Sequence, residues 1–425
     1  MHREMLEATG LTRAGRLAEA TTLLQRLLRS GSAPETNFTA ANDTADAPAG
    51  GASRVIDLVP ETIKITDRPS SSDAPLPSGA ERSGAGAAER NAGPRFAAAL
   101  RDLVGRVSRA RPAKPGPAER SPASHRDILP DGAQFVTGSY SDRAGSRAYK
   151  LYIPSGYRPG QPVPLVVMLH GCTQSPDDFA AGTRMNGLAE EHTCLIVYPA
   201  QPASANASKC WNWFNPGDQK RGQGEPSLIA SITRRIMRDY SVDPRRVYVA
   251  GLSAGGAAAA IMGATYPDLY AAIGVHSGLA CGAASDLPSA FAAMRQGMRV
   301  PVSRAGDAPG GEAYLRSVPT IVFHGDQDTT VHPGNGDAVI ARAKETAAPD
   351  LQLSVQHGQV PGGHAYSRTV QHDQSGRAIL EQWVIHAAGH AWSGGSPAGS
   401  YTDPRGPDAA REMLRFFLEQ PVPTG

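Results

Sequence analysis

The 425-residue sequence lacks the features that would place it among disulfide-rich, membrane-spanning or strongly charged proteins. Its four cysteines are scattered, too few for a disulfide framework and without the paired spacing of a zinc site. Basic residues number 42 against 40 acidic ones, so the net charge of +2 gives no reason to expect nucleic acid as a partner. No apolar run is long enough for a transmembrane segment.

The first residues carry charges throughout, and they lack the apolar core and small-residue cleavage site of a signal peptide. We therefore expect a cytoplasmic protein whose cysteines are mostly thiols. Within residues 1–30, leucines recur at steps of three and four, which predicts an amphipathic helix. This helix would dock either on its own domain or on a second copy of the chain, and a targeting role is the alternative.

Residues 31–125 are rich in Gly, Ala, Ser and Pro. Such a segment cannot bury enough apolar surface to offset its ordering entropy, so we expect a low-complexity linker. Two stretches within it differ. Residues 54–65 have the composition of a short strand or a docking peptide. Residues 95–114 predict an Arg-rich amphipathic helix, which is either solvated or binds a surface.

From residue 126 onward the sequence is typical of a globular domain. Apolar runs that suit buried strands alternate with stretches that suit helices. The expected helices cover residues 178–191, 227–240, 254–265, 334–346 and 408–419. This alternation predicts an α/β fold over residues 126–425, with a mostly parallel twisted sheet and helices on both of its faces.

A serine lies between glycines directly after one of the buried strands. The segment RRVYVAGLSAGG places Ser253 between this strand and an alanine-rich helix. Gly251 and Gly255 suit the sharp turn that such a junction needs. A serine held there has a strained backbone, an exposed hydroxyl and the positive end of a helix beside it. We therefore predict that Ser253 is a nucleophile; the alternative is a structural turn serine.

A serine hydroxyl becomes a strong nucleophile only with a base and a carboxylate beside it. In this architecture the carboxylate follows a later strand, and PTIVFHGDQD offers Asp328 there. Asp326 is the alternative, and its other role would be to accept hydrogen bonds from loop amides. The base should lie between the last strand and the last helix, where we predict His390. His386 falls within that strand and is expected to be packed, and His364 precedes it.

Two backbone amides are expected to stabilise the developing oxyanion. We predict the N–H of Ala254, directly after the nucleophile, and the N–H of Cys172, after the strand VVMLHG. Aromatic residues follow in the stretch KCWNWFNPGD. Trp211 is our candidate for a substrate contact, with packing against the core as the alternative, whereas Trp213 and Phe214 favour packing. This chemistry implies neither a metal nor a cofactor.

Several motifs together resemble the polyhydroxybutyrate depolymerase family of esterases: HGCTQSPDDF, CWNWFNPGD, VYVAGLSAGG, VFHGDQD and GHAWSGG. They are most similar to the type 1 catalytic domain of short-chain polyhydroxyalkanoate depolymerases, an α/β-hydrolase, over about residues 130–420. The resemblance implies the same roles for Ser253, Asp328, His390 and the Cys172 amide. It also raises a disulfide between Cys172 and Cys210, which we leave open. His364 departs from the pattern, since relatives carry arginine there.

We therefore expect a serine esterase that hydrolyses short-chain polyhydroxyalkanoate polymer or oligomer esters through an acyl-enzyme. The alternative enzyme is a feruloyl or acetylxylan-type carbohydrate esterase, which the same fold group includes. The alternative outside enzymes is a granule-associated scaffold protein. The expected partner is a polyester or small ester, with the surface of a storage granule as a further candidate. The family resemblance also allows an extracellular location.

Overall fold

The computed structural model describes residues 62–63, 129–297, 318–347 and 350–420. The predicted helix within residues 1–30 and the Arg-rich stretch 95–114 lie outside these residues. Of the stretch 54–65, only β1 (Thr62–Ile63) is described, and it pairs antiparallel with β9 (Gln352–Gln359). Among the helices that the structure describes, none has the length and apolar character needed to cross a membrane.

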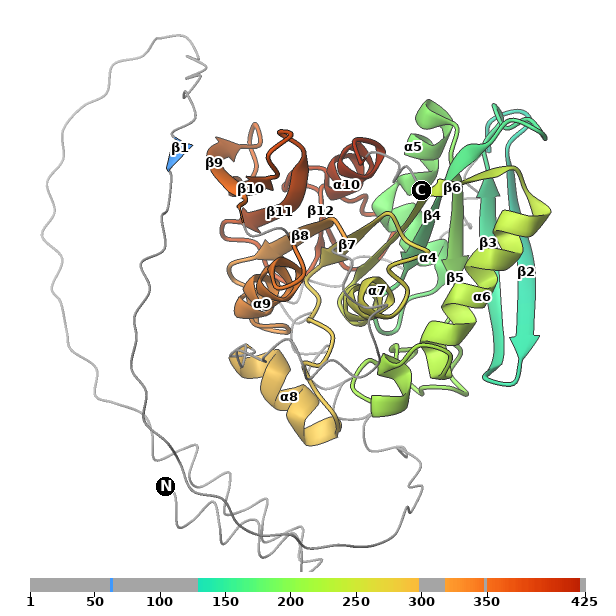
Figure 1. Ribbon diagram of the computed structural model, residues 1–425, viewed down its shortest axis with the longest axis horizontal. Coiled ribbons are helices and arrows are strands. Elements are labelled where there is room, and N and C mark those ends of the chain that lie inside the picture. The colour runs from blue at the N-terminus through green and yellow to red at the C-terminus, as the bar shows by residue number, and fades with distance from the viewer. Residues whose placement is uncertain (1–61, 64–128, 298–317, 348–349, 421–425) are drawn as a thin grey trace, which may run out of the picture. The chain divides into compact units, whose positions relative to one another are not determined.

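Eleven strands form one sheet in the order β1-β9-β10-β11-β8-β7-β6-β4-β5-β3-β2 (Figure 1). Six neighbouring strands in its middle run parallel: β5 (Leu195–Pro199), β4 (Val163–Leu169), β6 (Val242–Leu252), β7 (Ala272–His276), β8 (Thr320–Gly325) and β11 (Ala378–Ile385). Antiparallel strands extend both edges: β2 (Gln134–Asp142) and β3 (Gly145–Ile153) on one side, β10 (Ala365–His372) and β9 on the other. The mostly parallel sheet is confirmed.

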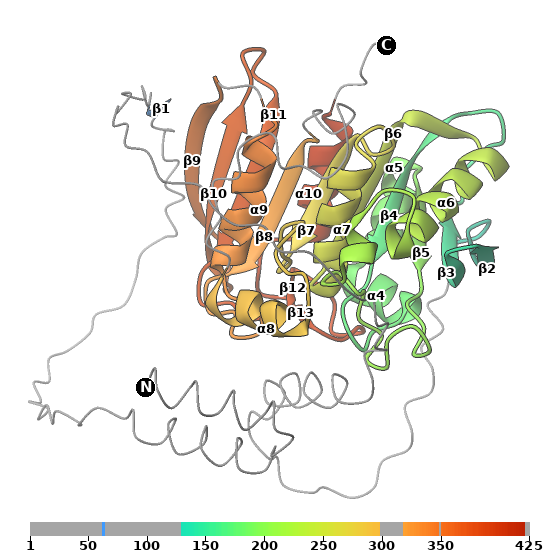
Figure 2. The same ribbon diagram turned by 60° about the horizontal axis from the view of Figure 1, so that its bottom comes forward.

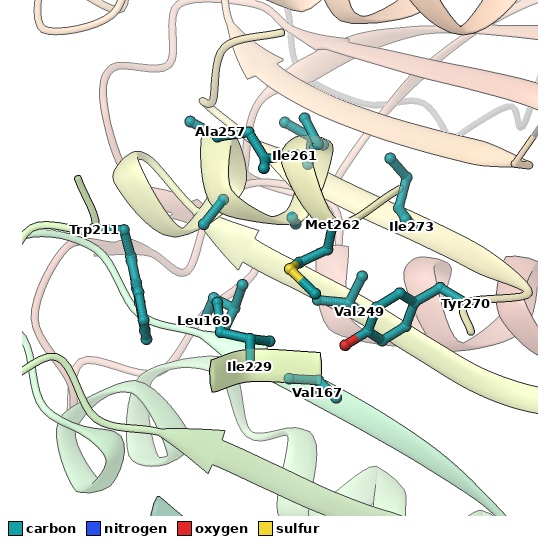
Figure 3. Close-up of a cluster of buried hydrophobic side chains, with 14 of the residues drawn as sticks. Val167, Leu169, Trp211, Ile229, Val249, Ala257, Ile261, Met262, Tyr270 and Ile273 are labelled. Carbon is teal, nitrogen blue, oxygen red and sulfur yellow. The ribbon is translucent and has the colours of Figure 1, made fainter. Parts of the chain in front are cut away.

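Helices cover both faces of this sheet, and each face has its own hydrophobic core (Figure 2). One core contains apolar side chains of α6 (Gly224–Asp239), α7 (Ala254–Thr265), α8 (Leu287–Gln296) and α9 (Gly334–Lys344), and Figure 3 shows part of it. The other contains those of α4 (Pro176–Thr183), α5 (Met185–His192) and α10 (Ala409–Leu418). The predicted α/β-hydrolase fold is confirmed in this layered arrangement.

Some elements differ from the prediction. The helix expected over residues 178–191 is two helices, because Arg184 has a φ of 58° and ends α4 before α5 begins. Strands β9 and β10 were not predicted. Their sequences, QLSVQHGQ and AYSRTVQH, are largely polar, and most of their side chains remain partly exposed, so neither has a strong apolar pattern. Short strands β12 (Trp392–Ser393) and β13 (Thr402–Asp403) pair with each other in the segment between β11 and α10.

Candidate active site

Ser253 lies at a strained turn where β6 ends and α7 begins. Its backbone has φ 57° and ψ −119°, a conformation that residues with a side chain rarely adopt. The chain passes so closely here that a Cβ on Gly251 would lie 2.3 Å from Gly255 backbone atoms, and one on Gly255 would lie 2.0 Å from the Leu169 carbonyl oxygen. The two glycines therefore permit the turn, as the sequence predicts.

Asp328 is held in the loop after β8 with its side chain fully buried. One carboxylate oxygen accepts hydrogen bonds from the N–H groups of Thr330 (2.9 Å) and Val331 (2.8 Å). The other accepts one from His390 Nδ1 at 2.7 Å and has His324 Nε2 at 3.4 Å. Burial raises the pKa of this carboxyl, but the charge of His390 and the donors of both histidines outweigh it, so the pKa lies well below its usual range.

His390 follows β11, and its side chain is 7% exposed. Because Nδ1 donates to the Asp328 carboxylate, the lone pair of the neutral ring is on Nε2, which can act as a proton acceptor. Ser253 and His390 line the same small cavity, together with Cys172, Thr330 and Tyr401. The structure thus brings the three side chains that the sequence singles out to one place.

The loop after β4 places Cys172 beside Ser253, and both residues line two neighbouring cavities. Cys172 forms a disulfide with Cys210, which answers the pairing that the sequence left open. The N–H of Thr173 donates to the Ser208 carbonyl at 2.6 Å and fixes the following peptide. Ala254, the other predicted oxyanion donor, is the first residue of α7 and lines one of these cavities.

His170 holds the loop after β4 in place through two hydrogen bonds, a role that the sequence did not indicate. Its Nε2 accepts the Gln201 N–H at 3.1 Å, so Nδ1 carries the proton and donates to the Gly171 carbonyl at 2.8 Å. Burial lowers the pKa of His170 to about 4, which keeps the ring neutral and this bonding pattern intact. A histidine at the end of an apolar strand was the only available signal.

An apolar cavity opens beside Ser253. Its lining includes Trp213, Phe214, Phe291 and Met294, together with the disulfide. Trp213 and Phe214 are buried, at 6% and 1% exposure, and yet border this space. The sequence favoured packing for these two aromatic residues. They do pack in the core, and they also form a wall of the cavity.

The interpretation of Trp211 as a substrate contact is wrong. Its side chain is fully buried in the core shown in Figure 3, and its indole N–H donates to the His170 carbonyl at 3.0 Å. Trp213, two residues further on, borders the cavity, and Trp211 does not. Trp211 therefore supports the loop beneath the site and does not face a ligand.

Glu225, also missed, organises the aromatic loop from the start of α6. It is buried and accepts hydrogen bonds from the Asn212 N–H at 2.7 Å and the Asn212 side-chain amide at 2.8 Å. Gln201 also donates to it, and Arg147 lies 3.4 Å away. Burial and the nearby charge of Asp218 raise the pKa of Glu225 to about 7. The carboxyl acts as an acceptor that holds the loops of Gln201 and Asn212 and strand β3 to the start of α6.

A second array of the same residue types lies at the antiparallel edge. Ser367 Oγ is 2.8 Å from His386 Nε2, and His386 Nδ1 is 3.0 Å from Asp326 Oδ2. Asp326 Oδ1 also accepts the Ala387 N–H at 2.8 Å, as the alternative role for this aspartate predicts. His386 follows β11 instead of lying within it, and its side chain is 42% exposed, so the expectation that it is packed is wrong. His364 is buried and bonds Asp403 at 2.8 Å.

Comparison with known proteins gives three kinds of esterase. Residues 147–345 match the family model described as esterase PHB depolymerase. Poly(3-hydroxyalkanoate) depolymerase C from Paucimonas lemoignei is 36% identical over 255 residues, which cover 59% of this chain and 60% of that protein. Feruloyl esterase B from Thermothelomyces thermophilus is 29% identical, covering 54% of this chain and 80% of that protein. Acetylxylan esterase A from Talaromyces purpureogenus is also 29% identical, covering 50% and 56%.

The matches cover only part of this chain and only part of the related depolymerase. The chain spans about 60% of the length of the depolymerase that it matches. The segment that matches the family model includes Ser253 and Asp328 and ends before His390. His390 is therefore placed by the geometry of the loop after β11 and by its hydrogen bond to Asp328.

Proposed function

Since residues 147–345 belong to the PHB depolymerase family of esterases, we propose that this protein is a serine esterase that cleaves short-chain hydroxyalkanoate esters, as polymer or oligomer. The observation that supports it most is the convergence of three side chains. Ser253 stands on a strained turn, shares a cavity with His390, and His390 bonds the buried Asp328. Carboxylic ester hydrolysis needs this combination of nucleophile, base and orienting carboxylate.

In the proposed reaction, Ser253 Oγ attacks the ester carbonyl carbon while His390 Nε2 takes the hydroxyl proton. Asp328 keeps the ring in the required tautomer and stabilises the imidazolium that forms. The N–H groups of Ala254 and Cys172 donate to the oxyanion. The alcohol leaves with the proton from His390, and an acyl-enzyme remains. Water then attacks the acyl group, with His390 again as the base.

The cavity beside Ser253 supports a short acyl group as substrate. Its walls are apolar, and the side chains of Phe291 and Met294 from α8 and of Trp213 close it around the nucleophile. A small pocket of this kind binds a short aliphatic chain better than a bulky planar group, because a buried apolar surface gains most from close contact. We therefore place the hydroxyalkanoate acyl chain there.

A carbohydrate esterase is the second candidate, because relatives named feruloyl and acetylxylan esterase match 54% and 50% of this chain. The test is the rate of the purified full chain on 3-hydroxybutyrate oligomers, methyl ferulate and acetylated xylan. We expect kcat/KM for the oligomers to exceed the other two at least about tenfold. A preference for ferulate or acetylated xylan would favour the second candidate. Inactivity on every ester would favour a scaffold role, and Ser253→Ala is the control for contaminating esterases.

Two further parts of the proposal concern where the enzyme acts. We propose the surface of a polyhydroxyalkanoate granule as a partner, and loss of granule co-sedimentation after deletion of residues 1–120 would support it; unchanged binding would oppose it. We also propose the cytoplasmic location predicted from the sequence, and the disulfide between Cys172 and Cys210 weighs against it, since such bonds persist mainly in oxidising compartments. Thiol titration of the protein from cytoplasmic and exported fractions would show which pool carries the bond.

A further inference from the structure

His276, the last residue of β7, bonds two of the segments that form the site. Its backbone carbonyl accepts the Ser253 N–H at 2.8 Å. Its ring nitrogen Nε2 accepts the Ser393 N–H at 3.0 Å, and Ser393 is three residues beyond His390. One residue therefore connects the turn that carries the nucleophile to the loop that carries the base.

The bonding partners define the protonation of this ring. Because Nε2 accepts from a backbone N–H, the proton of the neutral ring is on Nδ1, which donates to Ser277 Oγ at 3.1 Å. The side chain is fully buried. Burial, with the nearby charges of His324 and His390, holds the pKa of His276 well below its usual value, while Asp328 raises it less. The acceptor nitrogen thus stays available throughout the working pH range of an esterase.

Aromatic neighbours hold the ring in place from two other elements. His276 stacks on Phe323 of β8, with centroids 5.8 Å apart and planes at 13°, and on Trp392, with centroids 5.1 Å apart and planes at 25°. Trp392 lies in the base-bearing loop, and Phe323 precedes the loop of Asp328. The Ser277 N–H also donates to the Phe323 carbonyl at 2.8 Å. Through its ring and its backbone carbonyl together, His276 therefore contacts the strand or loop of all three proposed catalytic residues.

We propose that His276 is a positioning residue for the ester hydrolysis, one that sets the distance between the base and the nucleophile through its Nε2 acceptor. The inference rests on the proposed function of Ser253 and His390. His276 touches neither substrate nor reacting atoms in this role. It fixes the loop after β11 three residues beyond His390, so loss of the acceptor would let the base move relative to Ser253. Displacements of about 1 Å in such geometry cost about 100-fold in rate.

The experiment compares substitutions that keep or remove the acceptor. His276→Phe retains a flat ring for stacking and leaves the Ser393 N–H without its partner, whereas His276→Gln offers a side-chain oxygen near the position of Nε2. We expect kcat on p-nitrophenyl butyrate to fall about 10- to 100-fold in the Phe variant, with KM changed less than about twofold, and Gln to recover most of the loss. Thr233→Val, which removes the buried Thr233–Tyr270 hydrogen bond of 2.9 Å, is the matched control and should keep kcat.

Different outcomes separate this proposal from the proposed function. If His276→Phe is folded and keeps the wild-type kcat, or if Gln has the same low kcat as Phe, the positioning role is wrong. If the Phe variant does not fold, His276→Asn replaces it, because its shorter side chain cannot reach the Nε2 position; kcat in Asn equal to that in Gln would then overturn the proposal. If Ser253→Ala retains wild-type turnover, the proposed function fails whatever the His276 variants do.

Discussion

Two arrays of serine, histidine and aspartate draw their aspartates from the loop after β8 and their histidines from the loop after β11, and their histidine–aspartate pairs differ in exposure more than in length. The histidine–aspartate distance is 2.7 Å between His390 and Asp328 and 3.0 Å between His386 and Asp326. The side chains of the first pair are 7% and 0% exposed, and those of the second pair 42% and 33%. A histidine–aspartate hydrogen bond therefore occurs once in a buried site and once near the surface.

The serines also differ. Ser253 stands at a strained turn beside the first residue of a helix and borders a cavity. Ser367 lies within β10, opposite His357 and Val384 on the neighbouring strands, and its hydroxyl is hydrogen-bonded to His357 Nδ1 at 2.9 Å. A nucleophile needs an exposed hydroxyl and amides aimed at the oxyanion. We infer that burial, strain and a cavity distinguish the catalytic array, and that the second array ties β9 and β10 to the loop after β11.

The largest expected effect is on the two serines. Ser253→Ala should lower kcat/KM for a short ester by about 10⁶-fold, because only the oxyanion donors and binding would remain. Ser367→Ala should keep kcat within about twofold, since its hydroxyl is proposed to bind only within the protein. Initial rates on p-nitrophenyl butyrate, with active-site titration, measure both. If Ser367→Ala lost most of its kcat while its thermal unfolding stayed normal, the proposed distinction between the two arrays would be wrong.

Of the two aspartates, the one in the buried array should also show the larger loss of kcat when substituted. The ratio between the two losses should be smaller than for the serines. Asp328→Asn removes the carboxylate that orients His390 and should lower kcat about 10³-fold or more, with little change in KM. Asp326→Asn loses a partly exposed pair with His386 and should lower kcat less than about fivefold. Separate values of kcat and KM for both variants across a pH series test this prediction. Equal losses in the two variants would mean that Asp326 also supports the base.

The sequence motifs predict the convergence of the proposed catalytic array well because each of its residues follows a strong local signal. Ser253 is bracketed by glycines that the turn requires, and Asp328 and His390 follow buried strands whose order is set by the fold. Local sequence says less about side chains whose direction depends on a loop. Trp211 and Trp213 are two residues apart, and only the folded loop decides that the first supports the core while the second borders the cavity.

Contacts between distant segments were the least predictable feature. The second array joins Asp326, Ser367 and His386 across strands of which β10 has no strong apolar pattern. The bond from Ser393 to His276 spans 117 positions and involves a histidine that sequence alone would place simply at the end of a strand. The disulfide pair was raised by family resemblance and left open, because two cysteines 38 positions apart carry no signal of their distance in space.

A third test uses the disulfide, which borders the first array. Cys172→Ala with Cys210→Ala should lower the free energy of unfolding by about 4 kcal/mol, because the bond closes a loop of 38 residues in the unfolded chain. We also expect kcat to fall about tenfold, since the loop with the Cys172 amide loses its link to the aromatic loop. Urea unfolding and ester turnover measure the two effects. Removal of the free, buried thiol in Cys194→Ala is the control and should leave kcat unchanged.

The smallest expected effect is on the pH dependence of stability. The pKa of Asp328 is lower in the folded chain than the ordinary value of 3.8. The stability that this carboxylate contributes is therefore present above pH 3.8 and is lost as the pH falls through the lower, folded-state pKa. A buried, paired aspartate of this kind contributes about 2 kcal/mol.

Urea unfolding between pH 6 and pH 2 tests this contribution. Asp328→Asn should flatten the fall in the free energy of unfolding at the acidic end, because the substituted side chain no longer takes up a proton. Asp326→Asn leaves Asp328 in place and should keep the part of the slope that Asp328 causes. The slope of the unfolding free energy against pH could instead be unchanged in Asp328→Asn. This would mean that the hydrogen bonds of the carboxylate only offset the cost of burying its charge, so that folding does not favour the charged form. The proposed contrast between a buried and a partly exposed array would then have to rest on the strained turn and the cavity alone.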